Sequence, residues 1–345
     1  MKKIISHFLI LALVLSLFCG CQSGNPPTKT EGNPLSSQDS AETEGKTEEK
    51  TEESQTNPAS VLDGKKVIFV GNSYTYYGNC VITKDVSVKK QSQRQNDKGY
   101  FYQICKANGA NVNVTNWTFA SHGLSDLFQS CAAGKSCNGA DHKSDLTDPV
   151  YDYVFLQERS GEDFTSQFVV ENVERAAEFF RGANPNVKIF FLAQSRLYEW
   201  QVGWMKALKE ISEKGVTVLE WGALVEDVID GKVQVPGSTT AYNRNSFVIK
   251  QSKDDGYHPN MLSGYITAQM AYCAITGESA VGQDYAFCTN ASLQSAFNIT
   301  NYISKYYKYQ NAVTNMKEIF QSPADMKGLQ ELMDQYLASE AYKSY

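Results

Sequence analysis

Residues 66–75 read KVIFVGNSYT, a short run of apolar and β-branched side chains that ends in a glycine and polar residues. The apolar run has the length of a buried strand and is too short for a helix. Gly71 permits a sharp turn, and Ser73 lies where a helix is expected to begin. We therefore predict a strand, a turn and a helix in that order. Taken alone, the segment is equally typical of a simple turn with a helix cap.

The chain from Val61 onward alternates strand and helix patterns. Four more short apolar runs follow the pattern of strands, at residues 112–117, 153–156, 188–193 and 216–219. Residues 168–181 and 204–211 place apolar side chains at helical spacing. The alternation predicts an α/β fold, a three-layer sandwich around a flavodoxin-like, five-stranded parallel sheet. In such sheets the functional site lies beyond the carboxyl ends of the strands, where Ser73 is expected.

A second polar motif, DGYHPN, occupies residues 255–260. The predicted domain contains three histidines, which are His122, His142 and His258. A serine nucleophile needs a base beside it and an acceptor that orients the base. Asp255 precedes His258 by three residues and can reach the same imidazole across a tight turn. The pair is a candidate base with its orienting carboxylate, and a capped loop with a surface histidine is the alternative.

Two further motifs follow predicted strands. Residues 119–125 read FASHGLS after the second strand, and residues 156–160 read LQERS after the third. Gly123 can offer an unobstructed backbone N–H, and Gln157 can offer a side-chain amide N–H. A developing oxyanion needs donors of this kind. The alternatives are a turn glycine and a hydrogen bond that closes the end of the sheet.

The ordered set of motifs resembles the SGNH (GDSL-like) hydrolase superfamily, in the branch with a Gly-Asn-Ser first motif and a Leu-Gln-Glu third motif. The resemblance spans residues 66–271, most of the predicted domain. It implies a catalytic triad in which Ser73 is the nucleophile, His258 the base and Asp255 its partner. It also implies an oxyanion hole formed by the Ser73 N–H, the Gly123 N–H and a side-chain donor, a role that we assign to Gln157.

Two positions depart from the usual family pattern. Asn72 stands where most members have aspartate, which is compatible with the mechanism because that residue is not the chemical base. Gln157-Glu158 stands where the family usually has Asn-Asp. Glutamine keeps the amide donor but adds a methylene, so its reach must differ.

The resemblance implies a serine esterase that uses no cofactor and no metal ion. We expect it to remove short acyl groups, acetyl above all, from carbohydrate or from a related small-molecule ester. The candidates to stack against a sugar ring are Tyr74, Tyr76, Tyr77, Trp117, Tyr198 and Trp200. The alternative function is a catalytically silent surface lipoprotein that binds glycan with the same fold.

The N-terminus has the pattern of a bacterial lipoprotein signal. A basic start and an apolar run over residues 8–18 are followed by Gly20-Cys21. We predict a signal peptide over 1–20 and a lipidated Cys21 that anchors the protein to a membrane; an ordinary secretory signal is the alternative. Both place the mature protein outside the cytoplasm. Residues 21–60 are acidic and poor in large apolar side chains, which predicts a disordered tether.

The remaining residues, 61–345, form the predicted hydrolase domain, with a helical tail over about 291–345. The whole chain has a formal net charge of -6. The tether contains three lysines and eight acidic residues, so the domain itself is only mildly acidic. This balance indicates no nucleic-acid partner.

Beyond the lipidated cysteine the chain contains six cysteines, an even number in an exported protein. The predicted disulfides are Cys131–Cys137, Cys273–Cys288 and, by elimination, Cys80–Cys105. One alternative is a zinc site that includes Cys131, Cys137 and His142, although their spacing matches no common zinc pattern. The other alternative is reduced, buried cysteines.

Overall fold

The computed structural model describes residues 57–81, 92–93, 99–119, 122–126, 146, 150–159, 166–194, 204–248, 258–289 and 316–344. The chain divides into two compact units, Met1–Ser54 and Gln55–Tyr345, and every described residue lies in the second. The predicted signal peptide and Cys21 lie outside the described residues. Among the described helices, none is long and apolar enough to cross a membrane.

A sheet with the strand order β2-β3-β1-β4-β5-β6 forms the centre of the described fold. Its parallel strands are β1 (Lys66–Gly71), β3 (Asn113–Thr118), β4 (Tyr153–Leu156), β5 (Lys188–Leu192) and β6 (Thr217–Leu219). A two-residue strand, β2 (Ser92–Gln93), pairs antiparallel with β3. The five parallel strands have the flavodoxin-like order 2-1-3-4-5, which confirms the predicted α/β fold class.

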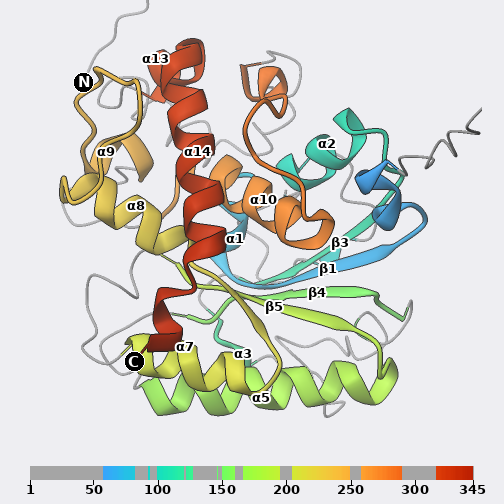
Figure 1. The fold of residues 1–345 in the computed structure, drawn as a ribbon. Coiled ribbons are helices and arrows are strands. Elements are labelled where there is room, and N and C mark those ends of the chain that lie inside the picture. The colour runs from blue at the N-terminus through green and yellow to red at the C-terminus, as the bar shows by residue number, and fades with distance from the viewer. Residues whose placement is uncertain are drawn as a thin grey trace, which may run out of the picture. The chain divides into compact units, whose positions relative to one another are not determined.

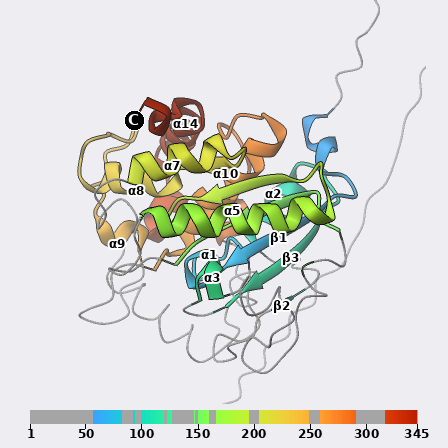
Figure 2. The ribbon, with the colours of Figure 1, turned by 90° about the horizontal axis from the view of Figure 1, so that it is seen from below.

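Helices cover both faces of the sheet (Figure 1; Figure 2). One face carries α2 (Tyr100–Ala107), α8 (Trp221–Ile229), α10 (Met261–Thr276) and α14 (Pro323–Ser339). The other face carries α5 (Ser166–Ala183) and α7 (Trp204–Glu213). The shorter helices are α1 (Ser73–Tyr76), α3 (Leu124–Asp126), α9 (Arg244–Phe247), α13 (Met316–Gln321), η1 (Pro58–Leu62), η3 (Ala286–Thr289) and η4 (Ala341–Ser344).

The central strand β1 is apolar on both of its faces. Val67 and Phe69 belong to the core beneath α10, whereas Ile68 and Val70 belong to the core beneath α5. Successive side chains of a strand point to opposite faces, so a strand covered on both sides needs apolar residues at every position. This constraint accounts for the unbroken apolar run that precedes Gly71.

Helix α10 is buried on nearly every side. It packs against α2 on one flank and against α8 and α14 on others. A helix surrounded in this way is a rigid element of the core. The residues just before α10 are therefore held in fixed positions relative to the sheet.

The folded part begins slightly before the predicted boundary at residue 61. Helix η1 buries Ala59 and Leu62 in the core that surrounds α10. The Asn57 side chain caps η1 by accepting a hydrogen bond of 3.1 Å from the Ala59 N–H. The last residues assigned to the tether therefore belong to the domain.

The structure corrects the disulfide prediction at four cysteines. Cys80, Cys105, Cys273 and Cys288 are all buried thiols that form no disulfide, so neither Cys80–Cys105 nor Cys273–Cys288 is a bridge. Each packs in the core as a small apolar side chain, which is a common role of free cysteine. Burial raises the pKa of the Cys273 thiol to about 12, and protonated thiols are unreactive. Both members of the predicted Cys131–Cys137 pair lie outside the described residues.

Asp325, near the start of α14, ties a surface segment to the helix. Its carboxylate accepts hydrogen bonds from the hydroxyls of Ser238, Thr240 and Tyr242, at 2.8 Å from Thr240 and 3.0 Å from Tyr242. Burial raises the pKa of Asp325, but the hydroxyl hydrogen bonds together outweigh burial and lower the pKa below its ordinary value. The ionised carboxylate thus holds the segment that leads into α9.

A close backbone contact reinforces the same attachment. A Cβ added to Gly328 of α14 would lie 2.2 Å from the Pro236 carbonyl oxygen. The described part of the C-terminal tail consists of α13, α14 and η4. The tail is therefore an integral part of the domain, and residues 290–315 lie outside the described residues.

We expect Asp325→Asn to lower the free energy of unfolding by about 1–3 kcal/mol at neutral pH, because hydrogen bonds to a charged acceptor contribute that much. The folded-state pKa of Asp325 is lowered, so its stabilising effect is present above the unfolded pKa of roughly 4. The effect is lost as the pH falls through the folded value. Urea unfolding at pH 7 and at pH 3 measures both quantities.

The matched control is Glu318→Gln, which neutralises an exposed acid on the neighbouring helix α13. This variant should unfold like the wild type at both pH values. An Asp325→Asn penalty that is equally large at pH 3 would contradict the assigned role of the charge.

Candidate active site

Ser73 lies directly beyond the carboxyl end of β1, at the start of α1. Asn72 caps this helix, because its Oδ1 accepts a hydrogen bond of 3.1 Å from the Tyr74 N–H. The Ser73 side chain is 9 % exposed. Its backbone N–H has no acceptor within the described part of the chain. Ser73 therefore lies at the junction between the central strand and a short helix.

His258 reaches Ser73 across 185 positions of sequence, and its Nε2 lies 2.9 Å from Ser73 Oγ. Two aromatic rings hold the imidazole. Tyr74 stacks on it with ring centroids 5.1 Å apart, and Tyr77 packs at 4.5 Å in a tilted arrangement. The predicted nucleophile and base are thus within hydrogen-bond distance of each other.

The two residues that follow His258 are both anchored. Val248 and Pro259 form an antiparallel β-bridge, and the Asn260 N–H donates to the Phe247 carbonyl at 2.9 Å. Asn260 also caps α10, because its Oδ1 accepts from Leu262 N–H at 2.9 Å. The imidazole is therefore fixed by the start of a buried helix rather than by a loose loop.

Two glycines bring α1 and α10 together. The chain after α1 passes Gly78, whose backbone touches the backbone of Gly264 in the first turn of α10. A Cβ on Gly264 would lie 1.5 Å from the Gly78 carbonyl oxygen, and one on Gly78 would lie 2.7 Å from Gly264 Cα. No other amino acid fits at either position without displacing the backbone. This contact sets the distance between the nucleophile and the base.

Gln157 has a different place from the one predicted. Its Oε1 accepts hydrogen bonds from the Asn72 N–H at 3.1 Å and the Thr75 hydroxyl at 3.0 Å, and its Nε2 donates to the Glu158 carbonyl. The side chain is only 1 % exposed. A Cβ at Gly71 would lie 2.8 Å from Gln157 Oε1, so the glycine makes room for the amide. Gln157 therefore clamps the first motif and is not an oxyanion donor open to substrate.

Gly123 lies beyond β3 at the start of α3 and is buried. The preceding carbonyl, that of His122, accepts a hydrogen bond of 2.8 Å from Asn72 Nδ2. The second motif is thus attached directly to the turn that carries Ser73. Asp255 lies outside the described residues, so its role as the partner of His258 stays a prediction.

Sequence reasoning missed the roles that several residues play in the site. Tyr77 packs on the imidazole, Asn260 caps the helix behind it, and Gln194 at the end of β5 donates to the Glu158 carbonyl at 2.8 Å. The signal for Asn260 was an Asx residue just before a long apolar run. The signal for Gly264 was a glycine inside a helical pattern, which indicates close packing.

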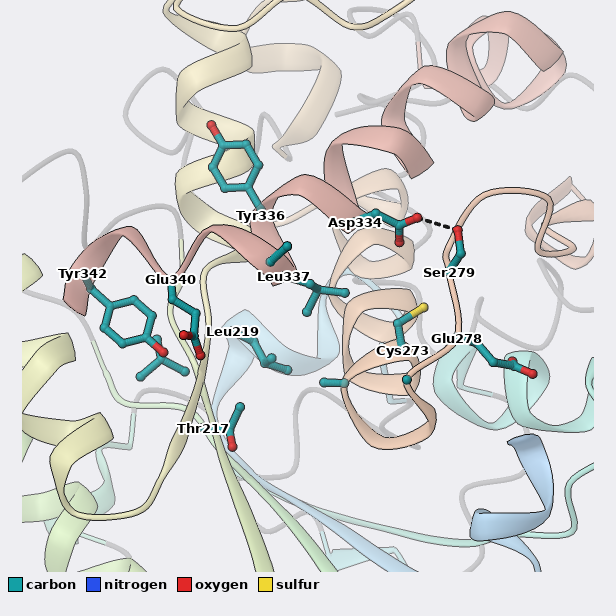
Figure 3. A pocket seen from close by; sticks show the side chains of 14 residues that line it. Thr217, Leu219, Cys273, Glu278, Ser279, Asp334, Tyr336, Leu337, Glu340 and Tyr342 are labelled. Carbon is teal, nitrogen blue, oxygen red and sulfur yellow. Dashed lines mark hydrogen bonds between the residues drawn. The ribbon is translucent and has the colours of Figure 1, made fainter. Parts of the chain in front are cut away.

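A separate cavity of about 450 Å³ opens at the β6 edge of the sheet (Figure 3). Its lining includes Leu219 of β6, Cys273 and Glu278 at the end of α10, and Asp334, Leu337 and Tyr342 from α14 and η4. All three of its carboxylates are already engaged: Glu278 with the Tyr272 hydroxyl, Asp334 with Ser279 at 2.5 Å and Glu340 with Lys343 at 2.6 Å. Neither Ser73 nor His258 lines this cavity.

No protein-family model matches the sequence, and no curated protein matches it. Solved structures that resemble the chain include a protein described as a GDSL-like lipase from Parabacteroides merdae, with 14% identity, a TM-score of 0.43, and coverage of 62% of this chain and 96% of that one. An acetylxylan esterase from Geobacillus stearothermophilus has 12% identity, a TM-score of 0.42, and coverage of 64% and 97%. An alpha/beta hydrolase enzyme from the metagenome of Lake Arreo has 15% identity, a TM-score of 0.42, and coverage of 63% and 96%. Sequence identities and TM-scores this low carry no functional conclusion for this chain.

We expect Gly264→Ala to destabilise the protein by at least about 1–3 kcal/mol, the usual cost of overpacking, because the added methyl group meets backbone atoms that cannot rotate away. The matched control is Gly182→Ala in α5, where an added Cβ meets nothing within 4 Å. That change should stabilise by up to about 1 kcal/mol, since alanine favours helix. Thermal unfolding of the two variants gives the comparison, and equal behaviour would disprove the close contact.

Proposed function

We propose that this chain is a serine esterase of SGNH type that removes short acyl groups, chiefly acetyl, from carbohydrate or a related small-molecule ester. The observation that carries the proposal is the 2.9 Å contact between His258 Nε2 and Ser73 Oγ at the carboxyl end of β1. A serine hydroxyl becomes a nucleophile at neutral pH when an adjacent base takes its proton. A buried serine whose hydroxyl faces an imidazole at this distance has the arrangement that such activation needs.

In the first step, Ser73 Oγ attacks the ester carbonyl carbon while its proton passes to His258 Nε2. The carbonyl oxygen becomes an oxyanion, and the Ser73 and Gly123 N–H groups are the proposed donors to it. The tetrahedral intermediate then collapses, and the bond to the alcohol oxygen breaks. His258 returns the proton to the leaving alcohol, and the acyl group stays on Ser73.

In the second step, water attacks the acyl-serine carbonyl carbon and gives its proton to His258. The Ser73–acyl bond breaks, Ser73 regains its proton, and the carboxylic acid leaves. Asp255 is the proposed acceptor for the other imidazole nitrogen, where it would hold the tautomer and stabilise the charged ring. The aromatic contacts from Tyr74 and Tyr77 keep the ring in the same orientation throughout.

The structure narrows the candidates for a sugar-stacking residue. Trp117 and Tyr76 are fully buried core residues, and Tyr77 is 8 % exposed beneath the imidazole. Tyr198 and Trp200 lie outside the described residues. Of the four described candidates, Tyr74 is partly exposed and adjoins the imidazole, so it is the one best placed to contact a substrate ring. A lipid at Cys21 and the tether that follows would restrict the enzyme to extracytoplasmic esters near the membrane.

The test is hydrolysis of acetylated sugars and of p-nitrophenyl esters of rising chain length. We expect a clear fall in kcat/KM beyond acetate, and loss of turnover by a factor on the order of 10⁴ to 10⁶ in Ser73→Ala. Ser60→Ala, which changes an exposed serine of η1, is the matched control and should be unaffected.

Three outcomes would contradict the proposal. Full activity of Ser73→Ala would show that Ser73 is not the nucleophile. A preference for long acyl chains would show that the enzyme is not a deacetylase. Binding of glycan without turnover of any ester would favour a silent glycan-binding lipoprotein.

A further inference from the structure

Two tyrosine rings lie against the imidazole of His258. The Tyr74 ring is stacked on it, with the ring centroids 5.1 Å apart and the ring planes at 21°. The Tyr77 ring is tilted by 45° to the imidazole, with the centroids 4.5 Å apart. An aromatic ring attracts a cation that lies within about 6 Å of its centroid. The imidazole therefore has two aromatic neighbours close enough to respond to its charge.

Both tyrosines belong to the helical turn that begins with Ser73. They are three positions apart, a spacing that places two side chains on the same side of a helix. The Tyr77 N–H donates a hydrogen bond of 3.0 Å to the Ser73 carbonyl, which closes the turn. The element that presents the nucleophile therefore also presents two rings to the base, although the base belongs to the segment before α10.

The Tyr77 ring has an aromatic neighbour of its own. Tyr76 stacks on it with the ring centroids 5.2 Å apart and the ring planes at 23°. Tyr76 is 3 % exposed and Tyr77 is 8 % exposed. Little water therefore reaches the contact between Tyr77 and the imidazole. The attraction between a cation and an aromatic ring is stronger when water is excluded from it.

The charge of His258 changes during the proposed reaction. The imidazole must be neutral to accept a proton, and it becomes a cation when the proton has moved from Ser73 Oγ to Nε2. The electron pair left on Oγ forms the bond to the acyl carbon. The faces of an aromatic ring are electronegative, so a tyrosine ring attracts the imidazolium more strongly than the neutral imidazole. An interaction that strengthens in this way lowers the barrier to the chemical step.

We propose that the rings of Tyr74 and Tyr77 stabilise the imidazolium that His258 becomes when it takes the proton from Ser73. In this role neither ring touches the substrate, and each acts through His258. The inference rests on the proposed function, because the positive charge develops only if His258 is the base. The attraction is greater after proton transfer than before it, so its loss appears in kcat rather than in KM.

The decisive experiment changes the charge on the ring faces while it keeps the shape of the rings. Tyr74→Phe and Tyr77→Phe are each the parent of a series in which the new phenylalanine carries one, two and three ring fluorines. Fluorine withdraws electron density from the ring and weakens its attraction for a cation. We expect kcat for p-nitrophenyl acetate to fall stepwise, by roughly 2- to 30-fold over a series, with KM nearly unchanged.

Each series is compared with its own phenylalanine parent, so the loss of the tyrosine hydroxyl does not enter the comparison. The matched control places the same fluorinated residues at Phe180, which is 2 % exposed and belongs to the core beneath α5. Fluorination at Phe180 should leave kcat unchanged. A role of the tyrosine rings in packing alone would leave kcat constant within each series, because the members of a series have nearly the same shape.

The outcomes separate the two proposals. If the wild type turns over esters and kcat is constant within both tyrosine series, the role of the rings is wrong and the esterase assignment stands. If the wild type turns over no ester, both are wrong. A stepwise fall in kcat at either tyrosine, with no fall at Phe180, supports both. An equal fall at Phe180 would show that fluorine acts by disturbing the fold, and would overturn the role of the rings.

Discussion

The backbone contact between Gly78 and Gly264 determines where the nucleophile lies relative to its base. Ser73 lies at the start of α1, just beyond β1, whereas His258 lies three residues before α10, and no local sequence links them. The contact allows α1 and α10 to approach until an added Cβ would overlap a carbonyl oxygen at 1.5 Å. The 2.9 Å distance from His258 Nε2 to Ser73 Oγ follows from it. A side chain at either glycine would separate the two elements that carry the chemistry.

The rest of the domain supports that contact. The apolar core on one face of the sheet surrounds α10, and α14 holds the segment before α9 through Asp325. Val248, which directly follows α9, forms an antiparallel bridge with Pro259, and Pro259 directly precedes the residue that caps α10. On the sheet side, Gln157 and Glu158 lie at the end of β4 and fix the turns that carry the proposed oxyanion donors. Stability and site geometry therefore share the same buried polar contacts.

The strands and the candidate nucleophile and base followed from the sequence because each leaves a local pattern. An apolar run, a glycine turn and a polar residue at a strand's end predicted where Ser73 lies, and the resemblance to SGNH hydrolases indicated His258.

The role of Gln157 was assigned wrongly, because a one-methylene change in reach cannot be converted to a direction without the neighbouring Gly71. The disulfides at Cys80–Cys105 and Cys273–Cys288 were also wrong, because an even number of cysteines does not determine whether they pair or stay buried as thiols. The Asn72 contact with His122 was missed because it joins two loops that only the folded sheet brings together.

The central claim is that His258 activates Ser73 for attack on an acyl carbon. The most direct measurement is reaction with a fluorophosphonate, followed by peptide mapping of the adduct by mass spectrometry and by comparison of rates with His258→Ala. The account predicts one adduct, on Ser73, and a rate that falls by orders of magnitude when the imidazole is removed. An adduct on a different residue, or an unchanged rate in His258→Ala, would contradict it.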